Sequence, residues 1–518
     1  MIFYGDEMLE DYIGFIDDVI WNDVLTYVLL GAGIFFTFRL RLLQIRRFPE
    51  MLRTLARPAV NDPAGISPFQ ALCASLAARI GTGNVVGVAV ALYLGGPGAA
   101  FWMWLVAALG MATAFAEVSL AQLFKVRAGD AYRGGPAFYI ARGLQAPRAA
   151  MVFSICLIIV FGLAFNAVQA NSIAGAAQEA FGVAPLWTGV AVTIAAALVI
   201  SGGVTGVARF SAVVVPVMAV AYIAVALAVL AINIDQTPAL LKLIVSSAFG
   251  FGPAAGGVAG GMTAAMMNGV RRGLFSNEAG MGSAPNIAAV ATPSPHHPCS
   301  QGFVQALGVF IDTLVVCTAT ALLILLSGKL QPGSGVTGVQ LTQQAMNVHL
   351  GHWGAPFVSI AITCFAFTSI AGNYAYAEGA LAYLRFDGRA GLLLLRLGLL
   401  AMTLWGAMAQ VSTVFGLADI TMGVMAAINI ASIVLLSGLV VRLARDYLAQ
   451  RDAGREPEFD PALLPELAGV IEPGVWDRPP AAGTRVAKKV GEPPVAPVAA
   501  TPAAAPATPG GAPRQPGV

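Results

Sequence analysis

Long apolar stretches alternate with short polar ones along most of the chain. A transmembrane helix needs about 20 predominantly apolar residues, so this pattern predicts about eleven membrane-spanning helices. A transmembrane barrel would instead show segments of about ten residues with alternating hydrophobicity, which the sequence lacks. We therefore expect an all-α polytopic membrane protein. The apolar stretches lie at residues 23–43, 69–93, 98–124, 150–180, 186–202, 210–233, 257–291, 303–328, 354–382, 391–410 and 414–441.

The composition supports a membrane protein. The chain is 57% hydrophobic and 11% charged, with a mean hydropathy of +0.76, whereas a soluble domain is about 25% charged. A net charge of +2 is too small to favour a nucleic-acid partner. The five cysteines contain no C-x-x-C pair, so neither a disulfide framework nor a metal cluster is expected. The acidic start, MIFYGDEMLEDYIGFIDDVIWND, lacks the basic region of a cleavable signal.

Basic residues in alternate loops predict the orientation. Arginine-rich sequences follow the first, third, ninth and last apolar stretches: RLRLLQIRRFPEMLRTLARP, KVRAGDAYRGG, RFDGR and VVRLARDYLAQR. Basic loops are cytoplasmic in most membrane proteins. We therefore expect residues 1–22 outside a bacterial-type inner membrane and the C-terminal tail, 442–518, in the cytoplasm. The Pro/Ala-rich end of that tail is predicted to be disordered from about residue 473.

Two of the predicted spans carry polar, glycine-rich interruptions. AARIGTGNVV (77–86) lies within the second span, and SNEAGMGS (276–283) lies within the seventh. Close helix packing explains many membrane glycines, but Gly81 and Gly83 are two residues apart and so face different sides of a helix. Glycine also permits non-helical backbone, and unwound backbone at mid-membrane is tolerated where it faces a ligand or polar cavity. Both stretches are therefore predicted to be breaks that line a site.

The positions of these breaks predict an inverted repeat. With the helix at 23–43 set aside, the remaining spans divide into five within 69–233 and five within 257–441. Because each set has an odd number of spans, the second set is inserted upside down relative to the first. Each break lies in the first helix of its set. Paired interruptions in inverted halves are typical of secondary transporters with a site near the bilayer midplane.

Several motifs resemble the alanine/glycine:cation symporter family, the sodium:alanine symporters. They are FQALCASLAARIGTGNVVGVAVALYLGGPGAAFWMW, GMATAFAEVSLAQLFK, YRGGPAFYI and GLFSNEAGMGSAPNIAAVA, and the resemblance extends from about residue 20 to 445. It implies a leucine-transporter-type fold with one extra helix before the two repeats. It also implies uptake of alanine or glycine coupled to sodium, with the lipid bilayer, the amino acid and sodium as the only partners.

The chemistry of an amino acid suggests which residues bind it. Its carboxylate favours the N–H groups that begin the half-helix after the first break, with the Gln169 side chain as a further donor; an interhelical hydrogen bond is the alternative for Gln169. Its ammonium group needs acceptors, which the second break can offer as backbone carbonyls and an amide. Aromatic and methionine side chains would close a small pocket. The candidates are Thr82, Gly83, Asn84, Phe165, Gln169, Phe275, Ser276, Asn277, Met281 and Phe367.

The resemblance also implies a sodium site between the first broken helix and the eighth helix of the fold. Sodium is a hard cation and prefers oxygen ligands. The implied ligands are the backbone carbonyls of Ala77 and Ile80 and the hydroxyls of Thr368 and Ser369. The alternative for the two hydroxyls is a hydrogen bond to a carbonyl one turn earlier in their own helix.

Charged residues near the breaks leave further alternatives. Arg79 immediately precedes the first break and Glu278 lies in the second, and we expect such charges to pair or gate rather than bind substrate, because an intramembrane charge needs a partner. Proton coupling on the same fold, through Glu278 or Glu378, is the second hypothesis. A membrane-embedded hydrolase is disfavoured because the four histidines lie in predicted loops, and no enzyme activity is expected. The adjacent His296 and His297 are poorly placed to chelate one metal ion.

Overall fold

A computed structural model describes residues 21, 24–58, 60, 62–129, 131–250, 261–331 and 333–477, without the side chains of 411–418. Three parts of the sequence predictions lie outside the described residues. They are the expected outer segment at 1–22, apart from Trp21, the start of the expected span at 257, and the tail from residue 478 onward. The described chain is helical apart from one short antiparallel hairpin, β1 (Val126–Ala128) and β2 (Ala131–Arg133).

The helices follow the apolar stretches of the sequence. In the first half they are α2 (Thr26–Arg39), α3 (Leu43–Arg46), α4 (Phe48–Leu55), α5 (Pro68–Arg79), η2 (Gly83–Gly87), α6 (Val88–Gly95), α7 (Gly98–Leu123), α8 (Pro136–Gly143), α9 (Pro147–Leu157), η3 (Ile158–Ala164), α10 (Phe165–Phe181), α11 (Pro185–Ile200), α12 (Gly203–Ile232) and α13 (Thr237–Ala248). In the second half they are α14 (Gly261–Asn277), α15 (Ala284–Ala288), α16 (Pro298–Val309), η5 (Phe310–Cys317), α17 (Thr318–Leu326), α18 (Gly338–Leu350), η6 (Gly351–Trp353), α19 (Gly354–Tyr383), α20 (Arg389–Met408), α21 (Val411–Leu435), α22 (Ser437–Asp452), η7 (Pro461–Leu463) and η8 (Pro465–Leu467).

Within the described residues, six helices are long and apolar enough to cross a membrane, or eight if two bent pairs each count as one span. The chain is therefore an all-helical polytopic membrane protein. Three of the eleven expected spans, at 23–43, 186–202 and 257–291, do not reach membrane-spanning length, since α2 has 14 residues, α11 has 16 and the described α14 has 17. The bent pairs are α5 with the helix from Gly83 to Gly95, at 53°, and residues 419–435 with α22, at 61°. The first bend was expected and the second was not.

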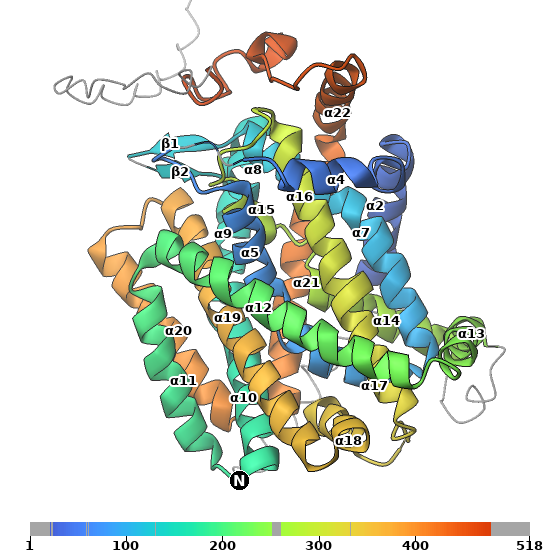
Figure 1. Cartoon of the computed structure of the whole chain (residues 1–518). Coiled ribbons are helices and arrows are strands. Elements are labelled where there is room, and N and C mark those ends of the chain that lie inside the picture. The colour runs from blue at the N-terminus through green and yellow to red at the C-terminus, as the bar shows by residue number, and fades with distance from the viewer. Residues whose placement is uncertain are drawn as a thin grey trace, which may run out of the picture. The chain divides into compact units, whose positions relative to one another are not determined.

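Helices far apart in the sequence pack side by side around the two interruptions. α7 packs against α14 and α16, and α10 packs against α19 and α20 (Figure 1). α5 contacts both α12 and α19. The unwound turn that follows α5 is therefore enclosed by helices from both halves of the chain.

The arginine-rich segments gather at one end of the helices, as the alternating pattern predicts. Figure 1 shows α4, the β1–β2 hairpin, α8 and α22 at this end. The segment after α22 packs there too: the Phe459 N–H donates to the His296 carbonyl (3.0 Å), and Glu472 pairs with Arg142 (2.9 Å). Val475 and Trp476 are buried. The packed chain thus continues past residue 473, where the sequence suggested that disorder begins.

Trp476 covers a buried cation at the end of α7. The Lys125 Nζ lies 5.0 Å from the Trp476 ring centroid and 4.4 Å from that of Tyr132, and it donates to the Ala291 carbonyl (3.0 Å). Burial lowers the pKa of Lys125 to about 7, although the nearby Asp62 carboxylate opposes this shift. The chain from α22 to Trp476 is therefore part of the packed protein.

Candidate functional site

The first interruption is an unwound turn between α5 and α6. α5 ends just before Ile80, whose ψ of 87° is not helical, and a π-helical turn over Gly83–Gly87 restarts the helix. A Cβ at Gly81 would lie 2.4 Å from the Ser369 Oγ and 2.9 Å from the Gln169 Oε1. The absence of a side chain at Gly81 therefore lets α10 and α19 approach the backbone of the break closely.

The second interruption follows α14, which ends at Asn277. Glu278, Gly280 and Gly282 have φ angles of 55°, 85° and 81°, so the chain reverses through left-handed backbone before α15. Such a φ is uncommon for a residue with a side chain, and Glu278 is held by a hydrogen bond from Ser283. Both predicted breaks are therefore present as interruptions of the helices.

A carboxylate on α7 holds the second interruption in place. The Glu117 side chain accepts hydrogen bonds from the N–H groups of Gly280 (3.3 Å) and Gly282 (3.1 Å). Asn429 of α21 donates to both Glu117 (2.9 Å) and the Gly280 carbonyl (2.9 Å), and it accepts from the Tyr139 hydroxyl. Glu117 and Tyr139 lie within two of the family motifs of the sequence, GMATAFAEVSLAQLFK and YRGGPAFYI, whereas no sequence signal pointed to Asn429.

Asp312 links the two interruptions. Its carboxylate accepts hydrogen bonds from the Asn84 amide (2.7 Å), the Ser276 hydroxyl (2.7 Å) and the Thr313 hydroxyl (2.7 Å). A Cβ at Gly83 would lie 3.0 Å from the Ser276 Cα, so the two breaks also touch directly. Asp312 is fully buried in η5, within the span predicted at 303–328, and nothing in the sequence indicated its partners.

The predicted donors near the first break are partly used within the protein. The Thr82 N–H donates to the Gln169 Oε1 (3.1 Å), and the Gly81 N–H donates to the Asn84 Oδ1 (3.0 Å). Gln169 therefore makes the interhelical hydrogen bond that was its alternative role. The buried groups without a hydrogen-bond partner in the described part of the chain include one donor at each break, the Thr82 Oγ1 and the Asn277 Nδ2. The Asn277 Oδ1 accepts from the N–H of residue 279.

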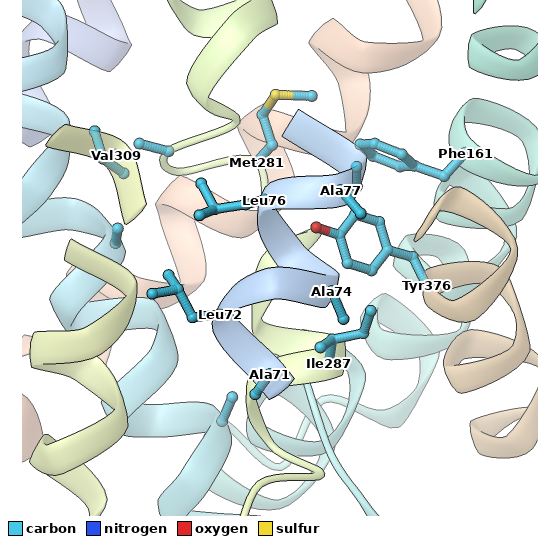
Figure 2. Close-up of a cluster of buried hydrophobic side chains, with 14 of the residues drawn as sticks. Ala71, Leu72, Ala74, Leu76, Ala77, Phe161, Met281, Ile287, Val309 and Tyr376 are labelled. Atoms are coloured by element: carbon cyan, nitrogen blue, oxygen red, sulfur yellow. The ribbon is translucent and has the colours of Figure 1, made fainter. Parts of the chain in front are cut away.

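Aromatic rings form a continuous row beside the breaks. Phe275 stacks on Phe165 with 4.9 Å between ring centroids, Phe165 contacts Phe161 at 4.8 Å, and Phe161 contacts Tyr376 at 5.2 Å. Figure 2 shows Phe161, Tyr376 and Met281 gathered around the end of α5. Phe367, the remaining predicted pocket residue, instead contacts Phe210 of α12 at 5.9 Å.

Oxygen atoms of α5 and α19 meet at the predicted sodium ligands. The Ser369 hydroxyl donates to the Ala77 carbonyl (2.9 Å) and also lies 3.1 Å from the Phe365 carbonyl. Thr368 is buried beside it and donates to the Phe365 carbonyl (2.8 Å). The carbonyl of Ile80 follows the last turn of α5. Both hydroxyls thus make the local helix contact, and only Ser369 also reaches α5.

Arg79 is buried next to the first break and makes no ion-pair contact with a carboxylate of the described residues. Its Nη1 lies 3.5 Å from the Gln305 carbonyl of α16, and its Nε and Nη2 have no hydrogen-bond partner among the residues that the structure describes. The side chain is 2% exposed. Arg79 and Glu278 are therefore not in direct contact, although the charge of Arg79 acts on the Glu278 carboxylate; the expectation that charges near the breaks pair or gate stays a prediction.

Other intramembrane charges are paired between helices. Asp419 of α21 binds Arg271 and Arg272 of α14, the latter at 3.3 Å. Glu378 of α19 lies 3.4 Å from Arg133. Arg396 donates to the Tyr374 hydroxyl (3.0 Å). These contacts match the expectation that a charge within the membrane needs a partner.

The histidines lie in different parts of the fold and make other contacts. No group of three or more His, Cys, Asp or Glu side chains suited to a metal occurs in the described ranges. His297 caps α16 through the Cys299 N–H and lies 3.2 Å from Asp446, and burial lowers the pKa of His297. His349 and His352 lie in α18 and η6, not in loops as predicted.

Comparison with known sequences decides the family. The profile described as the sodium:alanine symporter family matches residues 6–461. The chain belongs to the sodium:alanine symporter family. The probable sodium/glutamine symporter GlnT of Bacillus subtilis (strain 168) is 44% identical over 465 residues, which cover 90% of this chain and 96% of that protein.

Two further relatives in this family have names that state coupling ions. The sodium/alanine symporter AgcS of Methanococcus maripaludis is 40% identical over 445 residues, covering 83% of this chain and 96% of that protein. The sodium/proton-dependent alanine carrier protein of Bacillus sp. (strain PS3) is 38% identical over 425 residues, covering 77% of this chain and 92% of that protein.

Membership in the sodium:alanine symporter family confirms the resemblance seen in the sequence motifs. The chain is a multi-pass sodium-coupled amino-acid symporter, with sodium as its co-substrate. It is a transporter and not an enzyme, so the hydrolase hypothesis is excluded.

Proposed function

We propose that this symporter imports a small neutral amino acid, alanine or glycine, at a site between its two interrupted helices. The observation that carries the proposal is the contact between the breaks: Asn84 and Ser276 share the buried Asp312 carboxylate, and Gly83 packs against Ser276. Paired breaks that meet at membrane depth are the usual substrate site of secondary transporters.

The substrate carboxylate binds at the start of the half-helix after the first break. The amides of Thr82, Gly83 and Asn84 lie at the positive end of the helix from Gly83 to Gly95, which favours an anion. The unpartnered Thr82 hydroxyl and Asn277 amide are buried donors that a carboxylate would satisfy. Gln169 positions the turn by accepting from the Thr82 N–H.

The ammonium group binds at the opposite partial charge. α14 ends at Asn277, so the last carbonyls of α14, at Phe275 and Ser276, lie at the negative end of its dipole. The stacked rings of Phe165 and Phe275 and the Met281 side chain fill the space nearby. This packing favours an amino acid with a small side chain.

Sodium binds where the oxygens of α5 and α19 converge. The donor set is the Ala77 and Ile80 carbonyls with the Thr368 and Ser369 hydroxyls, all of them hard oxygen ligands of the kind that hard cations prefer. The existing contact of the Ser369 Oγ with the Ala77 carbonyl supports this assignment. A bound sodium would also join α19 to the break that binds substrate, which couples the two ligands.

The remaining features of the proposal concern architecture. Residues 69–233 and 257–441 form two inverted repeats of the leucine-transporter type, preceded by the helix at 23–43, and alternating access occurs by movement of one set of helices against the other. The arginine-rich end shown in Figure 1 faces the cytoplasm. The N-terminus then lies outside and the C-terminus inside a bacterial-type inner membrane.

Uptake into proteoliposomes tests the proposal. The purified full-length chain is reconstituted, and labelled alanine, glycine and glutamine are supplied under a sodium gradient, a proton gradient, or both. We expect a sodium gradient alone to drive uptake of alanine or glycine in preference to glutamine. Uptake driven by the proton gradient alone would overturn sodium coupling, and preferred uptake of glutamine would overturn the small-substrate assignment.

A matched pair of variants tests the sodium ligands. Ser369→Ala removes the hydroxyl that contacts Ala77, whereas Thr363→Val removes a hydroxyl of the same helix that only bonds to the Ser359 carbonyl (2.7 Å). The sodium concentration for half-maximal uptake should rise in the first variant and stay near wild type in the second. An equal rise in both would refute the assigned site.

A further inference from the structure

A surface cavity of about 540 Å³ lies at the arginine-rich end of the protein, away from the paired breaks. Elements distant in sequence form its wall: α8, the start of α9 and the end of α19 (Figure 1). None of the residues assigned to substrate or sodium lines this cavity. Its lining includes Phe138, Arg142, Arg148, Met151, Tyr383 and Arg385.

The cavity is positively charged. Three arginines line it and no carboxylate does. Arg142 pairs with Glu472 (2.9 Å), whereas Arg148 and Arg385 are exposed and make no ion pair within the described part of the chain. Arg148 also lies in the first turn of α9, where there is no acidic residue, so the positive end of that helix adds to the charge.

An apolar strip leads away from the cavity along a candidate membrane span. Met151 lines the cavity, and Ile155 and Ile159 follow it at intervals of one helical turn within the span Pro147–Phe181. They are 46%, 46% and 40% exposed, respectively. The cavity therefore combines cations at the end of a span with an exposed apolar path into the membrane depth.

We propose that this cavity binds the headgroup of an anionic phospholipid. The planar guanidinium group of arginine forms two parallel hydrogen bonds to phosphate oxygens. Basic pockets between transmembrane helices on the cytoplasmic side bind anionic lipid headgroups. The phosphate lies between Arg148 and Arg385, and an acyl chain follows Met151, Ile155 and Ile159. A free phosphate ion would use the arginines but not the apolar strip, so the strip assigns the site to a lipid.

Native mass spectrometry of the full-length protein tests the site. The protein, purified in detergent, is titrated with phosphatidylglycerol or phosphatidylcholine of the same acyl chains, with and without excess inorganic phosphate. Each arginine near a membrane surface contributes about 1 kcal/mol to anionic lipid binding, so Arg148→Gln with Arg385→Gln should weaken phosphatidylglycerol binding about 30-fold. Phosphatidylcholine binding should not change.

A charge-matched control separates a specific site from general surface charge. Arg41 and Arg46 are exposed, lie in another arginine-rich loop and do not line the cavity. Arg41→Gln with Arg46→Gln should therefore keep wild-type phosphatidylglycerol binding. Equal weakening in both double variants, or no preference for phosphatidylglycerol in the wild type, would overturn the proposal.

Two more outcomes are informative. Arg148→Lys with Arg385→Lys keeps the charge but not the bidentate contact, so this variant should bind phosphatidylglycerol more strongly than the glutamine double variant and more weakly than the wild type, provided that elution in size-exclusion chromatography shows a folded protein. Inorganic phosphate at high excess should displace little of the lipid. Complete displacement by phosphate would mean that the headgroup anion alone accounts for binding, which would overturn the assignment of the apolar strip.

Discussion

Replacing Gly81 by alanine should disable sodium coupling while leaving the protein folded. The added Cβ would lie 2.4 Å from the Ser369 Oγ and 2.9 Å from the Gln169 Oε1. Relief requires Ser369 to turn away from the Ala77 carbonyl, which it now contacts at 2.9 Å. The substitution therefore separates the oxygens that we assign to sodium without removing any of them.

The size of the effect follows from the cost of overpacking. An extra carbon in a well-packed interior costs about 1–3 kcal/mol. If sodium binding must supply this energy to restore the geometry, its affinity falls by a factor of about 5 to 150, since 1.4 kcal/mol corresponds to tenfold. We expect the sodium concentration for half-maximal alanine uptake to rise within that range.

The assay is initial alanine uptake into proteoliposomes across a series of sodium concentrations. Gly87→Ala is the matched control, because its Cβ would meet only the Thr82 carbonyl, at 3.9 Å. Thermal unfolding in detergent, with and without sodium, separates a loss of affinity from a loss of fold. Sodium should stabilise the wild type and Gly87→Ala, and stabilise Gly81→Ala much less.

One result would refute this reasoning. If Gly81→Ala were folded and showed the sodium dependence of Gly87→Ala, the contact between Gly81 and Ser369 would have no part in sodium binding. The site would then have to be sought elsewhere in the protein.

Three further predictions concern other groups. Asp312→Asn puts an amide where a carboxylate now accepts hydrogen bonds from Asn84 and Ser276. Because hydrogen bonds to charged groups contribute about 1.5–3 kcal/mol, alanine uptake should fall at least tenfold. Near-normal uptake would contradict a role of Asp312 in joining the breaks. Phe275→Ala opens space beside the first break, so glutamine should compete with labelled alanine more strongly; an unchanged inhibitory concentration would argue against this pocket. Burial lowers the pKa of Lys125 to about 7, whereas in the unfolded chain this lysine stays protonated up to about pH 10.4. Between these pH values the unfolded state binds more protons than the folded state, so the contribution of Lys125 to the free energy of unfolding should rise with pH. Lys125→Met removes that contribution, and calorimetry should find a flatter dependence of Tm on pH in the variant than in the wild type.

The backbone of the site was the part that the sequence could predict. Glycines at 81 and 83 and again at 280 and 282 cannot be explained by helix propensity, so their pairing indicated breaks in two helices. Apolar length likewise predicted most of the long helices. These features depend on local backbone preferences, which a single sequence records.

The side-chain partners could not be predicted in the same way. Asn84 and Asp312 are 228 residues apart, and nothing local to either position specifies their contact. The sequence left two roles open for Gln169, and its hydrogen bond with the Thr82 N–H depends on the position of α10 against the break, which no local pattern records. The bend at residue 436 does have a local signal, because Ser437 and Gly438 follow it directly, but this signal was missed in the sequence.

The buried position of Trp476 determines how far a shortened form of this transporter must extend. The family profile ends at residue 461, but the chain up to Trp476 covers Lys125 and supplies Glu472 to Arg142. A shortened protein cut at the family boundary would lose both contacts, whereas one that ends after residue 477 would retain them. Protein designed for expression, tagging or crystallisation should therefore include Trp476 and not end where similarity to relatives ends.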